Sequence, residues 1–208
     1  MLLNSIKWRK EFDLVTQLEA WQEDRSPEAE YLRSTWPCGV FGIDKRGCPV
    51  YYARYGGLDL NALEKRVGFD RILCQALTEQ RQIEQGLDAA SKHAGKQLVQ
   101  VICVADFDGM SWWRAARSVP TFRKMSAVLD AHFPERLHVA FVARAPGIFA
   151  GIYKLAEAFL AADTKAKVRI CGKGEDAAAA LAQWVERSEI PDFLGGDAKC
   201  AIPDPNGA

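Results

Sequence analysis

The sequence has no excess of charge of either sign, because its 208 residues include 27 basic and 27 acidic side chains. No run of like charges is longer than a few residues. Broad nucleic-acid binding needs a basic excess or a long basic stripe, so this class is disfavoured. The balance still leaves room for one local cationic site.

Long apolar runs are missing as well. The closest candidate, residues 145–162, contains Lys154 and Glu157 and is short for the hydrocarbon core of a bilayer. The first residues have no basic lead and only a brief apolar run, so they do not resemble a secretory signal. We therefore expect any contact with membranes to be peripheral.

The six cysteines form no Cys-x-x-Cys pair, which disfavours zinc and thioredoxin-like sites. They are scattered along the chain, at positions 38, 48, 74, 103, 171 and 200. Cys103 and Cys171 lie in apolar, strand-like runs, where cysteine behaves as a small hydrophobic residue. We expect free thiols in a reducing compartment, the cytoplasm.

Catalytic motifs are also absent. The sequence has no P-loop, no dinucleotide-binding glycine pattern, no nucleophile elbow and no His-Glu-x-x-His motif. Asp106 and Asp108 could hold a divalent cation at a strand end, but an acidic turn closed by Gly109 is the simpler interpretation. Without a nucleophile, base and oxyanion site, we expect neither an enzyme nor a bound metal or cofactor.

What is present is the apolar periodicity of an α/β protein. Residues 1–35 are helical in pattern, with Ser26 as a helix cap, and a hairpin follows. The expected hairpin strands are residues 40–43 and 49–53, and the later strands are 98–105, 137–143 and 167–171. The expected helices are a short one capped by Asn61, one capped by Asp70 and running to residue 93, and those at 111–133, 148–160 and 175–187.

This order of elements indicates how the sheet is built. Strands that alternate with helices demand parallel pairing with right-handed crossovers, and the hairpin adds an antiparallel edge. We therefore predict a mixed, largely parallel sheet with covering helices. Pro120 should kink or split the helix at residues 111–133.

The helix at residues 148–160 is the most informative segment, because it carries two adjacent apolar rows. One row contains Ile148, Ile152, Leu155 and Phe159, and the other contains Phe149, Tyr153, Ala156 and Leu160. One row is enough to seat a helix on a sheet. The second row therefore belongs either to a fully buried crossover helix or to a helix that faces an acyl chain or a membrane.

Six segments complete a family resemblance, in the family's order and spacing. They are residues 41–51 (Phe-Gly-Ile-Asp-Lys-Arg-Gly-Cys-Pro-Val-Tyr), 104–109 (Val-Ala-Asp-Phe-Asp-Gly), 133–137 (Phe-Pro-Glu-Arg-Leu), 145–149 (Ala-Pro-Gly-Ile-Phe), 164–170 (Thr-Lys-Ala-Lys-Val-Arg-Ile) and 190–196 (Ile-Pro-Asp-Phe-Leu-Gly-Gly). Each motif is weak alone, but together they resemble the CRAL-TRIO family of lipid carriers, which includes phosphatidylinositol and phosphatidylcholine transfer proteins.

The resemblance implies a sheet floor and a hydrophobic lipid pocket closed by a gate helix, which residues 146–160 match. We expect residues 36–197 to form this domain, residues 1–35 to be the remnant of a preceding helical subdomain, and residues 198–208 to be a tail. The expected pocket lining is apolar, aromatic or small: Tyr51, Val101, Cys103, Phe107, Phe141, Phe149, Ile152, Tyr153, Leu155 and Phe159.

For the headgroup, the resemblance carries two residues over to this chain. In members that bind phosphatidylinositol, the Glu of the Pro-Glu-Arg motif and the Lys that opens the next strand contact the inositol phosphate, and these match Glu135 and Lys167. Surface charges unrelated to a ligand are the alternative. Arg144, where the family has Asn, adds a cation that lies either near the headgroup or on the surface.

The determinants of phosphatidylcholine binding look absent. In the founding exchanger a Ser and a Thr hold the phosphate, and Val101 and Cys103 stand at those positions. The expected ligand is therefore phosphatidylinositol, carried by a monomer between membrane surfaces. A carrier of a sterol, isoprenoid or fatty acid, or a protein-interaction module with a vestigial pocket, is the alternative.

Overall fold

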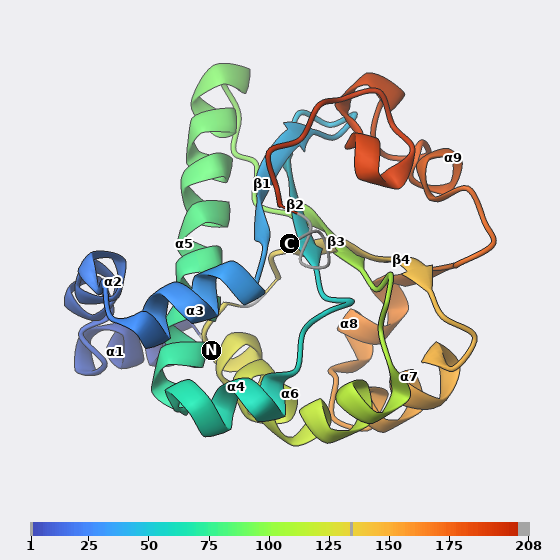
Figure 1. Ribbon diagram of the computed structural model, residues 1–208. Helices are drawn as coiled ribbons and strands as arrows, with labels where there is room; N and C mark the ends of the chain where they lie inside the picture. The colour runs from blue at the N-terminus through green and yellow to red at the C-terminus, as the bar shows by residue number, and fades with distance from the viewer. Residues whose placement is uncertain (1, 134, 204–208) are drawn as a thin grey trace.

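A five-stranded sheet forms the centre of the protein (Figure 1). The computed structural model describes residues 2–133 and 135–203. In spatial order the strands are β1 (Cys38–Ile43), β2 (Pro49–Arg54), β3 (Val101–Asp106), β4 (Leu137–Ala145) and β5 (Val168–Gly172). β1 runs antiparallel to β2, and all other neighbours are parallel. The predicted α/β class and the mixed, largely parallel pairing are confirmed.

Helices cover both faces of this sheet. α1 (Leu2–Glu11), α2 (Leu14–Glu23) and α3 (Pro27–Thr35) precede it, and α4 (Leu60–Val67) and α5 (Phe69–Ala94) join β2 to β3. α6 (Trp112–His132) joins β3 to β4, whereas α7 (Phe149–Glu157) and α8 (Ala162–Lys167) join β4 to β5. α9 (Ala177–Leu181) and two 3₁₀ turns (Arg187–Glu189 and Asp192–Leu194) follow. In Figure 1, α9 lies across the sheet from α6, α7 and α8.

Side chains along each strand alternate between two apolar layers, as the pleat requires. On one face, Tyr52 and Val104 join a buried cluster that includes Leu181 of α9. On the other face, Tyr51 and Val101 are covered by α5. Because both faces are apolar and both are covered, the central strands have the nearly continuous apolar sequences of a doubly covered sheet.

The three N-terminal helices share a core with the helices that follow. Trp21 of α2 and Leu32 of α3 are buried in one cluster with Leu63 of α4. Ser26 caps α3 as predicted, since its hydroxyl accepts a hydrogen bond from the backbone N of Ala29 at 3.3 Å. The domain boundaries at residues 35 and 197 stay predictions.

The beginning of the expected tail is attached to the core. The carbonyl of Ala198 accepts a hydrogen bond from the backbone N of Asp192 at 2.8 Å. Ile202 packs against the cluster on the α9 face of the sheet. Residues 204–208 of the predicted tail, and Pro134 of the predicted Pro-Glu-Arg motif, lie outside the described residues.

Several element boundaries differ from the predictions for local reasons. Asp59, not Asn61, caps α4 by accepting from the backbone N of Ala62 at 3.0 Å. Pro120 lies at an exposed position within α6 and does not end the helix, so the predicted split is wrong. α5 begins at Phe69, after Gly68 with a φ of 85°, and not at a cap on Asp70.

The last two predicted helices, at residues 148–160 and 175–187, are shorter in the structure. The predicted helix at 148–160 ends as α7 at Glu157, where tight i to i−3 hydrogen bonds close the final turn, and a separate helix, α8, follows. The predicted helix at 175–187 shrinks to α9 and a 3₁₀ turn. Neither break is marked by glycine or proline, so the sequence pattern missed both.

Gly56 offers a test of the loop arrangement at the carboxyl edge of the sheet. A Cβ atom at this position would lie 1.5 Å from the backbone carbonyl oxygen of Asp108, which is an impossible contact. We predict that Gly56→Ala lowers the free energy of unfolding by about 3 kcal/mol or more, measured by urea denaturation. Gly174→Ala, where no atom lies within 4 Å, is the control. Equal stability of the two variants would contradict the close approach.

Candidate functional site

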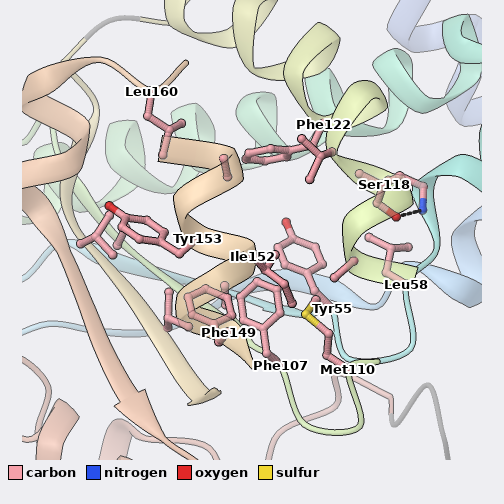
Figure 2. A pocket seen from close by; sticks show the side chains of 18 of the residues that line it. Tyr55, Leu58, Phe107, Met110, Ser118, Phe122, Phe149, Ile152, Tyr153 and Leu160 are labelled. Atoms are coloured by element: carbon pink, nitrogen blue, oxygen red, sulfur yellow. Dashed lines mark hydrogen bonds between the residues drawn. The ribbon is translucent and has the colours of Figure 1, made fainter. Parts of the chain in front are cut away.

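A cavity of about 290 Å³ lies between the sheet, α6 and α7 (Figure 2). The sheet contributes small and branched side chains, from Ala105, Ala140, Val142 and Val168. The helices contribute larger ones, including Phe122 and Met125 of α6 and Phe149, Ile152 and Tyr153 of α7. The loops add Tyr55, Leu58, Phe107 and Met110. Apolar groups on every side make this a site for a hydrophobic guest.

The lining contains few polar atoms, and the hydroxyl of Ser118 is already hydrogen-bonded within the protein. The hydroxyl of Ser118 donates to the carbonyl of Arg114 at 2.7 Å and accepts from the backbone N of Leu60 at 3.0 Å, the bond drawn in Figure 2. Charged side chains are absent from the lining formed by the described residues. Water would therefore find few partners inside, whereas an acyl or isoprenoid chain would match the walls.

α7 supplies the wall that the sequence singled out. All four members of its second apolar row line the cavity: Phe149, Tyr153, Ala156 and Leu160. Ile152 of the first row lines it as well. In Figure 2 the side chains of Phe149 and Ile152 point toward Phe107 and Tyr55, whereas Tyr153 points away from them on the other side of the helix. The second row thus borders a void, although Phe149 also packs in a buried cluster with Val142 and Ala145.

The first row of α7 divides between interior and surface. Ile148 is 40% exposed and Leu155 is 47% exposed. Phe159 lies beside Phe122, with ring centroids 6.0 Å apart, and does not line the cavity. Phe107, Phe149, Ile152 and Tyr153 are therefore the predicted lining residues that the structure brings together.

A second, smaller cavity of about 170 Å³ receives two of the predicted lining residues, Val101 and Cys103. It lies on the same sheet face, because Cys103 and Ala105 are two residues apart on β3. Its other walls include Leu129 of α6, one turn beyond Met125 of the larger cavity. Asp130 and Arg136 make it more polar, and burial raises the pKa of Asp130.

Two further predicted lining residues lie elsewhere. Phe141 points to the α9 face, where its ring centroid is 6.2 Å from that of Trp184, because its neighbours Ala140 and Val142 take the cavity side. The strand period of two forces this choice. Tyr51 is buried beneath α5, against Ile83 and Leu87.

The three predicted headgroup residues do not come together. Glu135 and Lys167 precede the parallel strands β4 and β5, so both lie at the amino edge of the sheet. Arg144 lies near the end of β4, at the carboxyl edge. Ala140 of β4 pairs with Val168 of β5, so Lys167 is level with Val139 and, at roughly 3.3 Å per residue, Arg144 lies about 17 Å farther along the sheet. The Arg144 guanidinium is also held by Asp106 and Asp108, so Arg144 does not lie where it could share one headgroup with the other two residues.

Arg144 belongs instead to an ionic cluster. Its Nε donates to Asp106 Oδ1 at 2.9 Å, and its Nη1 lies 3.3 Å from Asp108 Oδ2. Lys173 Nζ lies 3.2 Å from the other oxygen of Asp108. Buried Arg54 approaches Asp106 from β2, with Nε 3.7 Å from Oδ2. The two carboxylates considered as cation ligands are thus surrounded by basic side chains that hold the carboxyl edge together.

Glu135 and Lys167 lie outside this ionic cluster. Glu135 is exposed and has a left-handed backbone with a φ of 61°. Lys167 ends α8, and its ammonium group pairs with Asp163 one turn earlier. The side chain of Lys167 is only 20% exposed, and Thr164 and Val168 on either side of it line the larger cavity. Its position is therefore at the cavity margin.

Sequence reasoning missed the part of the wall that α6 provides. Ala115, Ser118, Phe122 and Met125 all line the cavity. They recur at intervals of three and four residues, which is the period of one helix face. That signal was available, but Ser118 and the charged residues between these positions obscured it.

A buried carboxyl group that sequence analysis also missed lies beneath α5. Burial raises the pKa of Glu79 to about 7, and the neighbouring polar side chains, Cys38 among them, oppose the shift only in part. The Cys38 thiol donates to Glu79 Oε1 at 3.4 Å. Tyr55 connects this group to the cavity, since its ring centroid is 6.1 Å from that of Trp36 and 6.0 Å from that of Phe107.

Two absences among the described residues bear on function. Within residues 2–133 and 135–203, no helix is both long enough and apolar enough to cross a bilayer. The same ranges hold no group of three or more His, Cys, Asp or Glu side chains placed to bind a metal ion.

Comparison with known proteins gives a consistent result. The model of the CRAL/TRIO domain family matches residues 33–196. The chain is 30% identical over 208 residues to "Phosphatidylinositol/phosphatidylcholine transfer protein SFH11" of Arabidopsis thaliana, covering 96% of this chain and 52% of that protein. It is 28% identical over 209 residues to "Protein real-time" of Drosophila melanogaster, covering 97% of this chain and 30% of that protein. The chain thus spans about half or less of the length of these curated relatives.

A solved structure agrees with the fold. The protein named in "Crystal structure of Sfh5" superimposes with a TM-score of 0.68 and 19% sequence identity, over 96% of this chain and 65% of that chain. At this identity the likeness concerns the fold alone.

The raised pKa of Glu79 predicts how stability depends on pH. Its ordinary pKa is 4.5, so the unfolded chain releases this proton near pH 4.5 while the folded chain keeps it until about pH 7. Stability from this group is therefore fully present below pH 4.5 and is lost as pH rises to about 7, a change of about 3 kcal/mol. Glu79→Gln should remove this loss, measured as the free energy of urea unfolding at pH 5 and pH 8.

The control for this experiment is Asp88→Asn, which neutralises an exposed carboxylate on the same helix. We expect it to change the difference between pH 5 and pH 8 little. The burial of an ionisable Glu79 would be refuted by a Gln variant whose pH profile parallels that of the wild type.

Proposed function

Because the chain belongs to the CRAL/TRIO domain family, we propose that it binds one molecule of phosphatidylinositol in the cavity beneath α7 and exchanges it with membranes. One observation carries the proposal, the void under the second apolar row of α7. Apolar surface of a helix that borders an empty space is costly to maintain, because the atoms that face the space lack packing partners. A hydrophobic guest supplies them.

The energetics favour a carrier over free diffusion. Each methylene group removed from water contributes about 0.8 kcal/mol, so two acyl chains contribute roughly 20 kcal/mol. Spontaneous desorption of such a lipid from a bilayer is correspondingly slow. A dry, apolar cavity lowers that cost without any covalent step, and the function needs no catalytic group.

The size of the cavity implies that α7 moves. Its volume of about 290 Å³ is just below the roughly 300–1,000 Å³ typical of small-molecule pockets. A complete phospholipid needs more room than this. Outward displacement of α7 would enlarge the cavity and open it, and we assign to residues 146–160 the role of gate.

For the headgroup we propose Lys167 and Glu135. Both lie at the amino edge of adjacent strands, and Lys167 adjoins the cavity lining. An ammonium group suits the phosphate and a carboxylate suits the inositol hydroxyls. Lys167 would exchange its partner Asp163, which is 71% exposed, for the phosphate, so little ion-pair energy opposes the change. Arg144 has no part in this proposal.

Phosphatidylcholine is the disfavoured ligand. Val101 and Cys103 lack hydroxyl groups, and they lie at the smaller cavity. We infer that the protein is a monomer in the cytoplasm that meets membranes transiently and binds no nucleic acid. A sterol or isoprenoid found in the purified protein would replace phosphatidylinositol and keep the carrier function.

A charge placed in the cavity tests the carrier function. We predict that Ile152→Glu reduces the lipid that co-purifies with the protein at least about tenfold, measured by mass spectrometry, because a carboxylate at an apolar wall repels acyl chains. Leu155→Glu is the matched control, since Leu155 lies on the same helix and is 47% exposed. If Ile152→Glu fails to fold, Ala156→Trp fills the cavity without a charge and should give the same loss. Equal lipid content in the wild type and in all of these variants would refute the proposal.

The headgroup assignment is tested by a lysine pair on α8. Lys167→Ala should slow the transfer of phosphatidylinositol between vesicles about tenfold, with the thermal unfolding temperature unchanged, because it removes the cation that faces the phosphate. Lys165→Ala removes an equal charge from an exposed position of the same helix and should transfer like the wild type. Normal transfer by Lys167→Ala would refute the assignment and leave the carrier function standing.

A further inference from the structure

Arg144, near the end of β4, has a backbone conformation that arginine seldom adopts. Its φ is 52°, in the left-handed region that is unfavourable for residues with a Cβ atom. It lies at a β-bulge, because β4 has one residue more than β5 between the last two paired positions of these strands. A strained residue of this kind persists only where its side chain and its surroundings hold it in place.

Two carboxylates from the end of β3 and the loop after it hold the side chain of Arg144. Its Nε donates to Asp106 Oδ1 at 2.9 Å, and its Nη2 donates to the second oxygen of the same carboxylate, so the pair is forked. Its third nitrogen, Nη1, lies 3.3 Å from Asp108 Oδ2. Because Asp106 is 3% exposed and the Arg144 side chain 22% exposed, water screens these contacts little. We call these three residues the anchor.

The residues on either side of the arginine are fixed to the neighbouring strands. The carbonyl of Ala143 accepts from the backbone N of Phe107 at 3.0 Å, and the carbonyl of Ala145 accepts from the backbone N of Lys173 at 2.9 Å. The ammonium group of Lys173 also lies 3.2 Å from Asp108 Oδ1. The end of β4 is therefore connected to both of its neighbours in the sheet, by backbone bonds and by the anchor.

α7 begins directly after this fixed point. Residues 146–148 are all that separates the end of β4 from Phe149, the first residue of the helix. Gly147 in this link is exposed, and a Cβ atom added to it would meet no atom within 4 Å, so the link has room to turn. The anchor thus fixes where the amino end of α7 lies, while the link allows the direction of the helix to change.

The carboxyl end of α7 has weaker restraints. Its last turn closes with i to i−3 hydrogen bonds of 3.2 and 3.3 Å, and residues 161–163 beyond it are exposed. Phe159 packs on Phe122 of α6, which is an apolar contact without a directional bond. In the part of the chain that the structure describes, neither Lys154 nor Glu157 of this helix forms an ion pair. The two ends of the helix are therefore held unequally.

We propose that Arg144 is a positioning residue, which holds the amino end of α7 on the sheet through Asp106 and Asp108 and so restricts the opening of the cavity to a swing of the carboxyl end. The proposal rests on the carrier function and adds the residue that sets how readily the cavity opens. Phe149, next to the held end, stays on the sheet while the rest of the helix moves. Without the anchor, the whole of α7 can lift, and a guest leaves faster.

Hydrogen exchange of the full chain, measured by mass spectrometry, tests the anchor. Arg144→Asn removes the guanidinium and keeps the backbone, because asparagine tolerates the left-handed conformation. We expect amides of residues 149–153 to exchange at least about tenfold faster in this variant, and those of residues 156–160 to change little. Arg187→Asn removes an arginine from an exposed ion pair with Asp197 and is the matched control, which should exchange like the wild type.

A second variant breaks the anchor without stranding a buried charge. Asp108→Asn removes a carboxylate whose side chain is 37% exposed, and it should also speed exchange at residues 149–153. Added to Arg144→Asn, it should have less than about half of its effect alone, because both changes break the same contact. Strictly additive effects would indicate that the two residues act independently.

Wild-type exchange at residues 149–153 in Arg144→Asn would overturn the proposal, as would additivity in the double variant. If Arg144→Asn does not fold, wild-type exchange in Asp108→Asn alone overturns it. Release of pyrene-labelled phosphatidylinositol to vesicles of phosphatidylcholine is the functional readout, and Arg144→Asn should release this lipid about fivefold faster. Hydrogen exchange needs no added lipid, so a protein that takes up no labelled lipid yet shows the expected exchange would refute the proposed ligand and support the anchor.

Discussion

The cavity of this protein exists because α7 covers one face of the sheet without filling the space beneath it. α7 turns one apolar row toward the sheet, yet the opposing side chains of β3, β4 and β5 are small or branched, and they leave about 290 Å³ unfilled. On the other face of the same sheet, α9 and the following turns fill the space completely enough to bury Leu181 and Val185. One sheet thus has one face that is fully packed and one face that borders an unfilled cavity. The difference lies in what each strand presents, because Phe141 goes to the packed side and Ala140 and Val142 go to the other.

The two edges of the sheet also have different physical roles. At the carboxyl edge, Asp106 and Asp108 are held among Arg54, Arg144 and Lys173, and most of this network is buried or half-buried. A buried ion network is costly to rearrange, because removing one partner leaves an uncompensated charge. At the amino edge, the ion-pair partner of Lys167 within residues 2–133 and 135–203 is an exposed aspartate of its own helix. The edge with exchangeable partners is the one at which a charged ligand is easier to accept.

An aromatic row connects the cavity to the core beneath α5. Ring contacts run from Trp36 through Tyr55 and Phe107 to Phe149 and Tyr153, with centroid separations between 5.0 and 6.2 Å. Glu79 lies at the α5 end of this row, and it is the buried group that titrates nearest to neutral pH among those whose pKa values are resolved for the described residues. Movement of α7 would be felt first by Phe149 and Tyr153. The row therefore joins the element proposed to move to a region that the N-terminal helices hold in place.

The sequence by itself determined the elements whose period is strong: the hairpin, the parallel strands, the helix at α5 and the two apolar rows of α7. It also determined the family, because six short motifs occur in order. The break between α7 and α8 and the true cap of α4 depended on single hydrogen bonds that no periodic pattern encodes. Only the tertiary structure decided which side of each strand faces the cavity, since a register shift of one residue exchanges the two faces. Phe141 therefore lies on the α9 face and not in the predicted lining. It also separated Arg144 from Glu135 and Lys167, because Arg144 lies near the carboxyl end of β4 whereas the other two residues precede β4 and β5.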